Sequence, residues 1–201
     1  MIRALIFDLG RTLIPFDFER SYDRLRRLCP RPLEDFRTEL RESGLVTRFE
    51  SGQLDPDEFV REFCRCLGAD IPYRDFCDIW SSIFLPETLI PEGFLRHLKP
   101  NYRLVLLSNT NVIHYDMLRK NYPILGLFDE HVLSFRVGVM KPAREIYQEA
   151  IRAAQCPAHQ CFFTDDIPEY VEAARREGID GVVFEGFEPL KQELALRGVR
   201  W

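Results

Sequence analysis

The stretch Ala4-Leu5-Ile6-Phe7-Asp8-Leu9-Gly10-Arg11-Thr12-Leu13 decides the fold of this chain. Its apolar first half is typical of a strand that is buried on both faces of a parallel sheet. The strand ends at Asp8, and ligands of open α/β sheets gather at the carboxyl ends of strands. Gly10 permits a sharp turn there, because glycine adopts backbone conformations, positive φ among them, that other residues resist. Asp8 is therefore a candidate nucleophile or metal ligand.

Length and composition predict a globular domain with an inserted unit. The chain has 201 residues, of which 46% are hydrophobic and 12% aromatic. The 27 basic and 32 acidic residues give a formal charge of −5 and form no basic stripe, so we expect no nucleic-acid or membrane partner. No apolar run approaches the roughly 20 residues of a membrane span, and the N-terminus lacks the apolar core of a signal peptide. We expect a cytoplasmic protein that is a monomer or a weak homodimer.

The six cysteines predict neither a zinc site nor a disulfide framework. There is no Cys-x-x-Cys pair, the one Cys-x-Cys lies in a predicted helix, and the four histidines are scattered. We expect small, buried and reduced side chains at all six positions: Cys29, Cys64, Cys66, Cys77, Cys156 and Cys161.

Residues 17–84 show helical spacing of apolar residues and almost no strand signal. The predicted helices cover residues 21–28, 33–42, 55–67 and 73–83. The third begins with Asp55-Pro56-Asp57-Glu58, which places an acid at the N-cap and proline at the first helical position. We expect the aromatic residues of this region to form its core rather than a substrate pocket: Phe59, Phe63, Phe76 and Trp80.

From residue 102 onward, strands alternate with helices. The predicted strands cover residues 103–107, 130–134, 161–164 and 181–184, and the predicted helices cover 113–120, 143–153, 168–177 and 189–196. This alternation predicts an α/β fold, a doubly wound parallel sheet with helices on both faces. We expect a core of residues 1–15 and 91–201 and an inserted all-helical cap of residues 16–90.

Polar side chains mark the ends of the later strands as well. Ser108 and Asn109 follow the second strand, Lys141 precedes a helix after the third, and Asp165-Asp166 end the fourth. Two adjacent carboxylates at the edge of a buried sheet repel each other unless a cation is bound nearby. Magnesium is the expected cation, because it prefers oxygen ligands and engages substrate phosphates.

Together these motifs resemble those of the haloacid dehalogenase superfamily of hydrolases, over essentially the whole chain. The motifs that carry the resemblance are Asp8 with Thr12, Ser108, Lys141 before Pro142, and Asp165-Asp166. The family implies a Rossmann-like core with a helical cap after the first motif. Ser-Asn-Thr at 108–110 and Gly-x-x-Lys-Pro-x-x-x-Ile-Tyr at 138–147 are similar to its sugar-phosphatase-like branch with a short cap.

The resemblance also implies roles for single residues. Asp8 would be the nucleophile, and Ser108 and Lys141 would be catalytic residues that hold the transferring phosphoryl group. Magnesium would bind four residues: Asp8, the Gly10 carbonyl, Asp165 and Asp166. Three neighbouring residues are candidates for substrate binding: Thr12, Asn109 and Arg11.

Two residues depart from the pattern of the family. Gly10 stands where most of its phosphatases carry an aspartate that serves as general acid and base, a role that contributes about 10²–10⁴-fold to the rate. Tyr170 stands where the family often has Asn or Asp, so we expect an outer-shell magnesium contact to be lost.

We therefore expect an enzyme, a magnesium-dependent phosphoric monoester hydrolase. It would act on a small phosphorylated metabolite, with a sugar phosphate as the narrower expectation, through an aspartyl-phosphate intermediate. One alternative is 2-haloacid dehalogenase-type hydrolysis, in which Asp8 attacks carbon without a metal; the paired Asp165 and Asp166 argue against it. A second alternative is a catalytically weakened binding or scaffold protein, for which Gly10 and Tyr170 argue.

Overall fold

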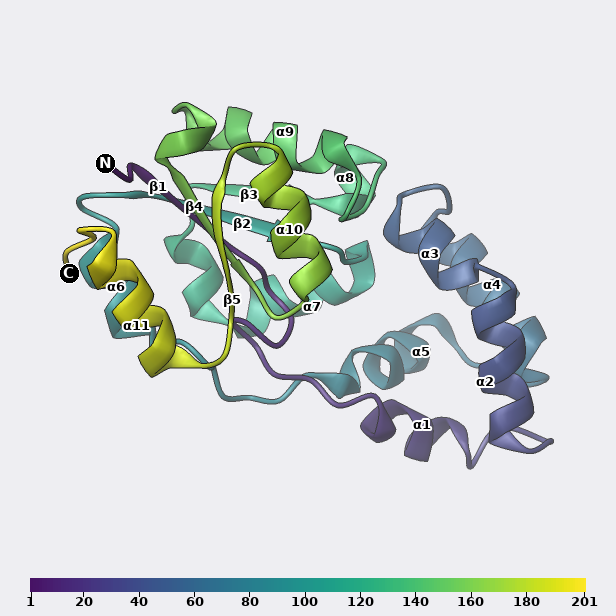
Figure 1. Cartoon of the computed structure of the whole chain (residues 1–201). Helices are drawn as coiled ribbons and strands as arrows, with labels where there is room; N and C mark the ends of the chain where they lie inside the picture. Colours follow the sequence, from purple (N-terminus) through teal and green to yellow (C-terminus); the bar gives the residue numbers. More distant parts are fainter.

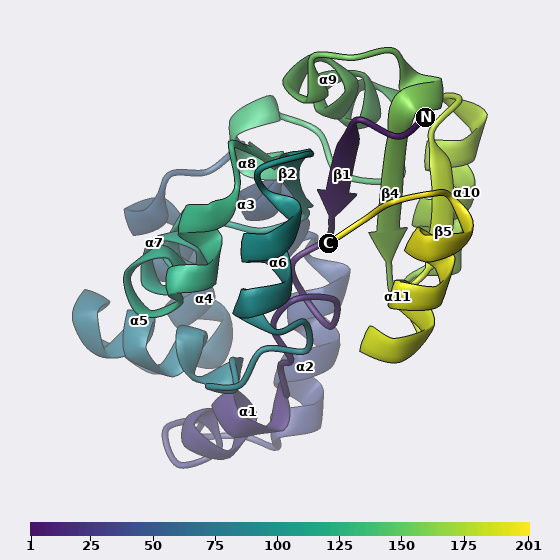
Figure 2. The same ribbon diagram turned by 90° about the vertical axis from the view of Figure 1, so that its left-hand side faces the viewer.

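The computed structural model describes all 201 residues and contains one sheet of five parallel strands. The strand order is β3-β2-β1-β4-β5, and Figure 2 shows β1 and β4 side by side with their arrows in the same direction. The predicted parallel α/β sheet is confirmed. The strands are β1 (Ala4–Phe7), β2 (Arg103–Ser108), β3 (Glu130–Leu133), β4 (Cys161–Asp165) and β5 (Asp180–Val183).

Helices cover both faces of the sheet, as Figure 1 shows. One layer contains α9 (Arg144–Ala154) and α10 (Pro168–Arg176), and the opposite layer contains α6 (Glu92–Leu98), α7 (Val112–Asn121) and α11 (Phe187–Leu196). The sheet is therefore buried between two hydrophobic layers, which agrees with the continuous apolar run of its first strand.

The central strand β1 supplies side chains to both layers. Ala4 and Ile6 belong to the cluster beneath α9 and α10, whereas Leu5 and Phe7 belong to the opposite cluster. Successive side chains of a strand point to opposite faces, so a strand between two layers needs apolar residues at every position. Four short elements complete the core and its connections: α8 (Ser134–Val137), η1 (Ser81–Ile83), η2 (Pro123–Leu127) and η3 (Ala158–Gln160).

The segment between β1 and α6 is entirely helical and lies beyond the carboxyl ends of the strands (Figure 1). Its helices are α1 (Glu19–Leu25), α2 (Leu33–Glu42), α3 (Leu45–Glu50), α4 (Pro56–Leu67) and α5 (Tyr73–Trp80). Asp55 caps α4 as predicted, because its Oδ1 accepts a hydrogen bond from the backbone N–H of Glu58 at 2.7 Å. The longest helix, α4, has 12 residues, and none is long and apolar enough to cross a membrane.

Some predicted elements were wrong in their bounds. The predicted helix over 73–83 ends at Trp80 and continues as the short 3₁₀ helix η1, and Ser134, predicted as a strand residue, begins α8. The predicted helix over 21–28 lies at residues 19–25 as α1, and no helix was predicted at α3 or at α6.

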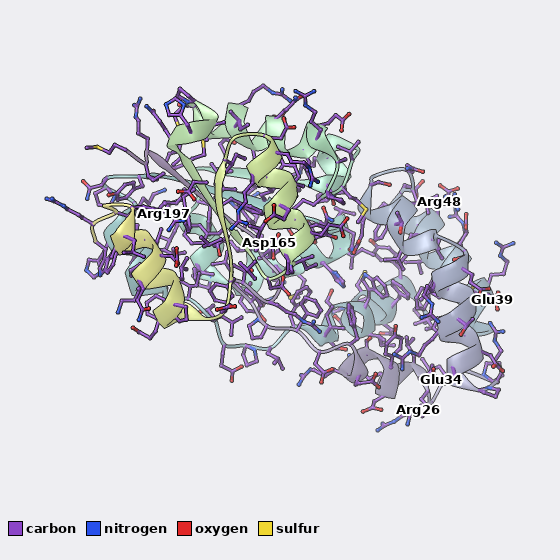
Figure 3. All side chains as sticks on the ribbon, viewed as in Figure 1. Arg26, Glu34, Glu39, Arg48, Asp165 and Arg197 are labelled. Carbon is purple, nitrogen blue, oxygen red and sulfur yellow. The ribbon has the colours of Figure 1, made fainter.

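The cap has its own hydrophobic core. Phe59, Phe63 and Phe76 are completely buried, and Trp80 packs against them with ring centroids 5.3 to 5.9 Å away. The prediction that these aromatic residues form core is confirmed. Charged side chains line the outer surface of the cap, among them Arg26, Glu34, Glu39 and Arg48, whereas Asp165 lies inside the α/β core (Figure 3).

All six cysteines are free thiols. Only Cys64 and Cys161 are buried, so the expectation of burial is wrong for four positions, which lie half-buried at the margins of the two hydrophobic cores. These four are Cys29, Cys66, Cys77 and Cys156.

The two segments that connect core and cap run side by side. Phe16 and Phe84 form an antiparallel bridge, and the backbone N–H of Leu85 donates to the carbonyl of Pro15 at 3.0 Å. A second contact joins α3 to α8, where the Ser134 hydroxyl donates to the carbonyl of Glu50 at 2.6 Å. The division into residues 1–15 with 91–201 and residues 16–90 stays a prediction.

Candidate active site

The parallel sheet brings Asp8 and Asp165 to neighbouring strand ends. Phe7 of β1 pairs with Thr164 of β4, and the backbone N–H of Asp8 donates to the carbonyl of Thr164 at 3.0 Å. Asp8 is 6% exposed and Asp165 is fully buried. Because the carboxyl ends of parallel strands share one edge of the sheet, residues 157 positions apart in sequence meet here.

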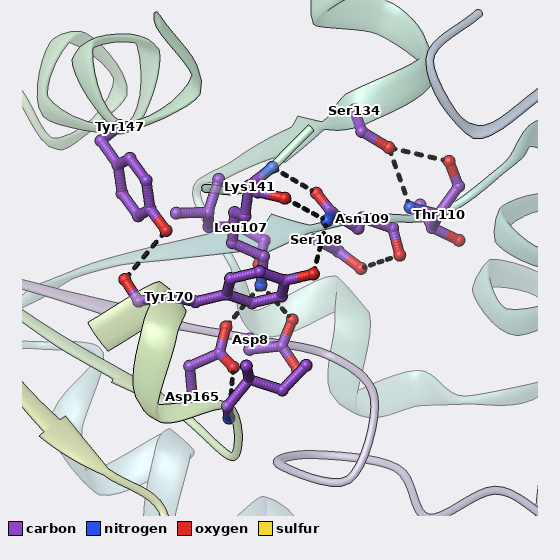
Figure 4. Close-up of polar contacts among 11 residues, drawn as sticks. Asp8, Leu107, Ser108, Asn109, Thr110, Ser134, Lys141, Tyr147, Asp165 and Tyr170 are labelled. Carbon is purple, nitrogen blue, oxygen red and sulfur yellow. Dashed lines mark hydrogen bonds and ion pairs between the residues drawn. The ribbon is translucent and has the colours of Figure 1, made fainter. Parts of the chain in front are cut away.

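Lys141 joins these two carboxylates. Its Nζ lies 2.6 Å from Asp8 Oδ1 and 2.5 Å from Asp165 Oδ2, and it also donates to the carbonyl of Leu107 at 3.3 Å (Figure 4). The side chain of Lys141 is 1% exposed. An ammonium group with three donors is thus satisfied by three oxygen atoms in a buried position.

Asn109 holds the backbone of Lys141. Its Nδ2 donates to the Lys141 carbonyl at 3.0 Å, and its Oδ1 accepts from the Lys141 N–H at 2.8 Å. The amide is therefore already engaged by the loop that carries the lysine, which fixes where the ammonium lies. A direct contact between Asn109 and substrate stays a prediction.

Burial and mutual charge determine the protonation of this cluster. Burial raises the pKa of Asp8 to about 7; the Lys141 ammonium opposes this rise and the charge of Asp165 adds to it. Burial by itself would lower the pKa of Lys141, but Asp8 and Asp165 outweigh burial and raise it. The lysine is therefore charged at neutral pH, and Asp8 keeps its proton to a higher pH than an exposed aspartate does.

A third carboxylate completes the cluster. Asp8, Asp165 and Asp166 each offer an oxygen, and these oxygens lie within 4.8 Å of one another. Asp166 is half-buried and forms no ion pair, and burial followed by the charge of Asp165 raises its pKa. With all three ionised, one ammonium leaves a formal excess of two negative charges. A divalent cation with oxygen ligands matches both that charge and those donors.

The structure places the other predicted residues around this cluster. Ser108 is 2% exposed at the end of β2, and its hydroxyl contacts only the Asn109 carbonyl, at 3.4 Å. Thr12 is fully buried and its hydroxyl has no hydrogen-bond partner within the protein. Arg11 is exposed, and its guanidinium carbon lies 4.8 Å from the ring centroid of Phe16. The roles of these residues stay predictions.

Gly10 is required for a reason other than its backbone angle. The positive φ in this loop belongs to Arg11, at 56°, and not to Gly10, so the expected positive φ at residue 10 is wrong. A Cβ on Gly10 would instead lie 2.7 Å from Phe16 Cε1. Gly10 is therefore fixed by a side chain six positions away, and the sequence around it gives no sign of that contact.

Tyr170 lies in the candidate active site, although the sequence indicated it only as a residue that differs from the pattern of the family. Its ring centroid lies 5.1 Å from Lys141 Nζ, and its hydroxyl accepts a hydrogen bond from Asn109 Nδ2 at 3.4 Å (Figure 4). Tyr147 of α9 anchors it by donating to the Tyr170 carbonyl at 2.9 Å. The aromatic ring thus covers the lysine, at a distance typical of a cation–π contact.

The fold and the cluster define a class of protein: a parallel α/β core with a helical cap, a buried carboxylate after the first strand, a lysine in the loop before α9, and two aspartates at the end of β4. Residues 2–178 match the model of the haloacid dehalogenase-like hydrolases, and the chain belongs to that family. The resemblance inferred from the motifs and the expectation of a hydrolase are both confirmed.

Comparison with individual proteins gives the same result. A D-ribitol-5-phosphate phosphatase of Bacteroides thetaiotaomicron is 24% identical over 195 residues, which cover 94% of this chain and 92% of that protein. A HAD-like hydrolase structure from Porphyromonas gingivalis is 29% identical over the full length of both chains, with a TM-score of 0.83. A HAD family enzyme of B. thetaiotaomicron, solved with magnesium and inorganic phosphate, is 26% identical over 91% of this chain and 94% of its own, with a TM-score of 0.78.

Proposed function

We propose that this protein is a magnesium-dependent phosphatase of small phosphorylated metabolites. The observation that carries the proposal is the cluster of three carboxylates within 4.8 Å, with the Lys141 ammonium bridging Asp8 and Asp165. The similar enzyme solved with magnesium and phosphate supports it. The expectation of a sugar phosphate has support from the relative named as a D-ribitol-5-phosphate phosphatase.

The proposed reaction begins at Asp8. One carboxylate oxygen attacks phosphorus, an O–P bond forms, the bond to the leaving oxygen breaks, and that oxygen takes up a proton. Water then attacks the aspartyl phosphate and releases inorganic phosphate and the free carboxylate. Asp8 needs to be ionised to attack, and the adjacent charged Lys141 favours that form.

Other residues bind the phosphoryl group and the metal in this proposal. Lys141, and Ser108 at the end of β2, would donate hydrogen bonds to the non-bridging oxygens, where negative charge gathers in the transition state. Asp8, Asp165, Asp166 and the Gly10 carbonyl would hold Mg²⁺. When bound, the ion neutralises charge on the phosphoryl oxygens.

The charge of the site also separates this function from carbon–halogen hydrolysis. A reaction without a metal would leave three clustered carboxylates with a single ammonium partner, which is unfavourable in a buried position. A divalent cation balances this excess charge, and its oxygen ligands include those of a phosphate ester.

A metal-dependence assay with 4-nitrophenyl phosphate tests the proposal. We expect hydrolysis with Mg²⁺, no hydrolysis after chelation, and none in Asp8→Asn. Asp17→Asn is the matched control, because Asp17 is an exposed carboxylate on the nearby connection to the cap, and asparagine caps a helix start equally well. Retained phosphate binding without turnover in the unaltered protein would favour the scaffold alternative. A panel of phosphorylated sugars and polyols then identifies the substrate.

A further inference from the structure

The ring of Phe16 occupies the space beside Gly10, two residues after the proposed nucleophile. A Cβ on Gly10 would lie 2.7 Å from Phe16 Cε1 and 3.3 Å from Cδ1. The first distance is shorter than real Cβ contacts, so any side chain at residue 10 requires the ring to move. The loop itself folds back on Gly10, because the backbone N–H of Arg11 donates to the carbonyl of Ile14 at 2.9 Å.

The connection between core and cap holds Phe16 in this place. Its backbone pairs with Phe84 in an antiparallel bridge. Its ring contacts those of Phe18 and Phe84, with centroids 5.0 and 6.1 Å away in edge-to-face geometry. Movement of the ring would therefore disturb the contacts of both connections between the core and the cap.

Arg11 lies on the same ring. Its guanidinium carbon is 4.8 Å from the Phe16 centroid, it forms no ion pair, and its backbone has a φ of 56°, which is uncommon for a residue with a side chain. An exposed arginine without a carboxylate partner, stacked on an aromatic ring, keeps its donors available to a ligand.

Residues 10–16 themselves carry no side chain that can donate a proton to a leaving oxygen. Arg11 is the only residue with a titratable side chain between Leu9 and Phe16, and a guanidinium does not release its proton in proteins. A leaving oxygen bound on the side of the loop next to Gly10 would face the ring of Phe16 and the positive charge of Arg11. The charge stabilises a departing anion, but it supplies no proton.

We propose that the loop at Gly10, where the ring of Phe16 blocks an acidic side chain at residue 10, restricts the enzyme to phosphate esters with acidic leaving groups, which depart without general acid catalysis. The inference rests on the proposed phosphatase function. The favoured class contains aryl, enol and acyl phosphates, and, among sugar phosphates, esters of the anomeric hydroxyl. Esters of primary alcohols would be poor substrates, because their leaving oxygen needs a proton. In this respect the chain would differ from the relative named as a D-ribitol-5-phosphate phosphatase, whose named substrate is a primary ester.

A series of substrates tests the unaltered protein first. The rates with phenyl phosphates of increasing leaving-group acidity are compared with those for glycerol 3-phosphate, and the 1-phosphate of one hexose is compared with its 6-phosphate. We expect kcat/KM, which reports the step that releases the leaving group, to rise steeply with the acidity of that group, with 4-nitrophenyl phosphate at least about 10²-fold above the primary alkyl ester.

Variants then test whether Phe16 is the cause. Gly10→Asp alone should bring no gain on glycerol 3-phosphate, because the ring blocks the new side chain. Gly10→Asp combined with Phe16→Ala should raise kcat on that substrate by about 10-fold or more over Phe16→Ala alone. The matched control, Gly10→Asn with Phe16→Ala, has the same shape without an acidic proton and should bring no such gain.

Each outcome has a defined meaning. A kcat/KM that is independent of the leaving group overturns the inference, and so does a selective gain on alkyl esters in Gly10→Asp with Phe16 intact. Loss of folding in the double variant, seen as a lowered melting temperature, leaves the substrate series to decide. If 4-nitrophenyl phosphate is not hydrolysed with Mg²⁺ present, the proposed function itself fails, and the inference fails with it.

Discussion

At the strand ends, Asp8, Lys141 and Asp165 are at most 6% exposed and contact one another through their charged atoms. On the loop that follows Asp8, Arg11 is exposed and forms no ion pair, and Gly10 faces the ring of Phe16. The first region is buried, charged and joined by ion pairs, as the binding of a phosphoryl group and a cation requires. The second is aromatic and partly open. The difference indicates that the fold determines where the phosphoryl group and the cation would bind. A few side chains on the loop after Asp8 would determine which leaving groups are accepted.

The largest effect on turnover is expected from a substitution in the buried cluster itself. Asp8→Asn should lower kcat for 4-nitrophenyl phosphate by at least about 10³-fold, because an amide cannot form the acyl phosphate. Steady-state rates with Mg²⁺ provide the measurement. A variant that keeps more than a tenth of the activity would show that Asp8 is not the nucleophile.

Magnesium binding tests the same region without turnover. Mg²⁺ should raise the melting temperature of the unaltered protein, since a ligand at 100 times its Kd adds about 2.7 kcal/mol to the free energy of unfolding. Asp166→Asn should weaken Mg²⁺ binding by about tenfold or more, measured by calorimetry. Asp166 suits this test because it is half-buried and forms no ion pair. Equal affinities in the two proteins would remove Asp166 from the metal site.

Tyr170 on α10 tests how far the cover over Lys141 matters for the buried cluster, because its ring lies over the ammonium group. Tyr170→Leu should lower kcat by roughly 3- to 30-fold, which corresponds to the loss of a cation–π contact worth about 0.5–2 kcal/mol. Tyr170→Phe keeps the ring, loses only the 3.4 Å hydrogen bond from Asn109, and should stay within about twofold of the parent. Equal losses in both variants would assign the effect to the hydroxyl instead.

The two regions also differ in how far the sequence predicted them. Asp8, Lys141 and Asp165 could be placed together from sequence, because parallel strands bring their carboxyl ends to one edge whatever the details of packing. The contact of Phe16 with Gly10 and that of Tyr170 with Lys141 depend on side-chain packing between separate elements. Hydrophobic periodicity does not encode such contacts, so sequence reasoning identified both positions only as departures from a pattern.

An effect on stability rather than on turnover is expected where the cap meets the core at α7. The His114 ring stacks on Trp80 with centroids 5.2 Å apart, and its Nε2 lies 3.1 Å from the Trp80 carbonyl. Burial lowers the pKa of His114 from 6.5 to about 4. Burial raises the pKa of Glu50 on α3 from 4.5 to about 7, and the nearby Asn111 amide opposes the rise.

These two shifts have opposite consequences for stability. The neutral His114 contributes fully above pH 6.5, and its contribution is lost as the pH falls toward 4, because the folded protein disfavours the charged ring. The neutral Glu50 contributes fully below pH 4.5, and its contribution is lost as the pH rises toward 7. Between about pH 4.5 and 6.5 the two slopes oppose each other.

In the parent protein, the pH dependences of stability due to His114 and Glu50 partly cancel. A variant that lacks one of these two side chains should therefore show the pH dependence due to the other. Relative to the parent, the free energy of unfolding of Glu50→Gln should rise with pH between 4.5 and 6.5, because only the His114 slope remains. That of His114→Gln should fall over the same window, because only the Glu50 slope remains. Urea unfolding of the three proteins at several pH values measures both differences, and comparison with the parent cancels the other titrating groups. Parallel curves would mean that neither side chain is desolvated at this contact, and the boundary between cap and core would then be as open as the loop at Arg11.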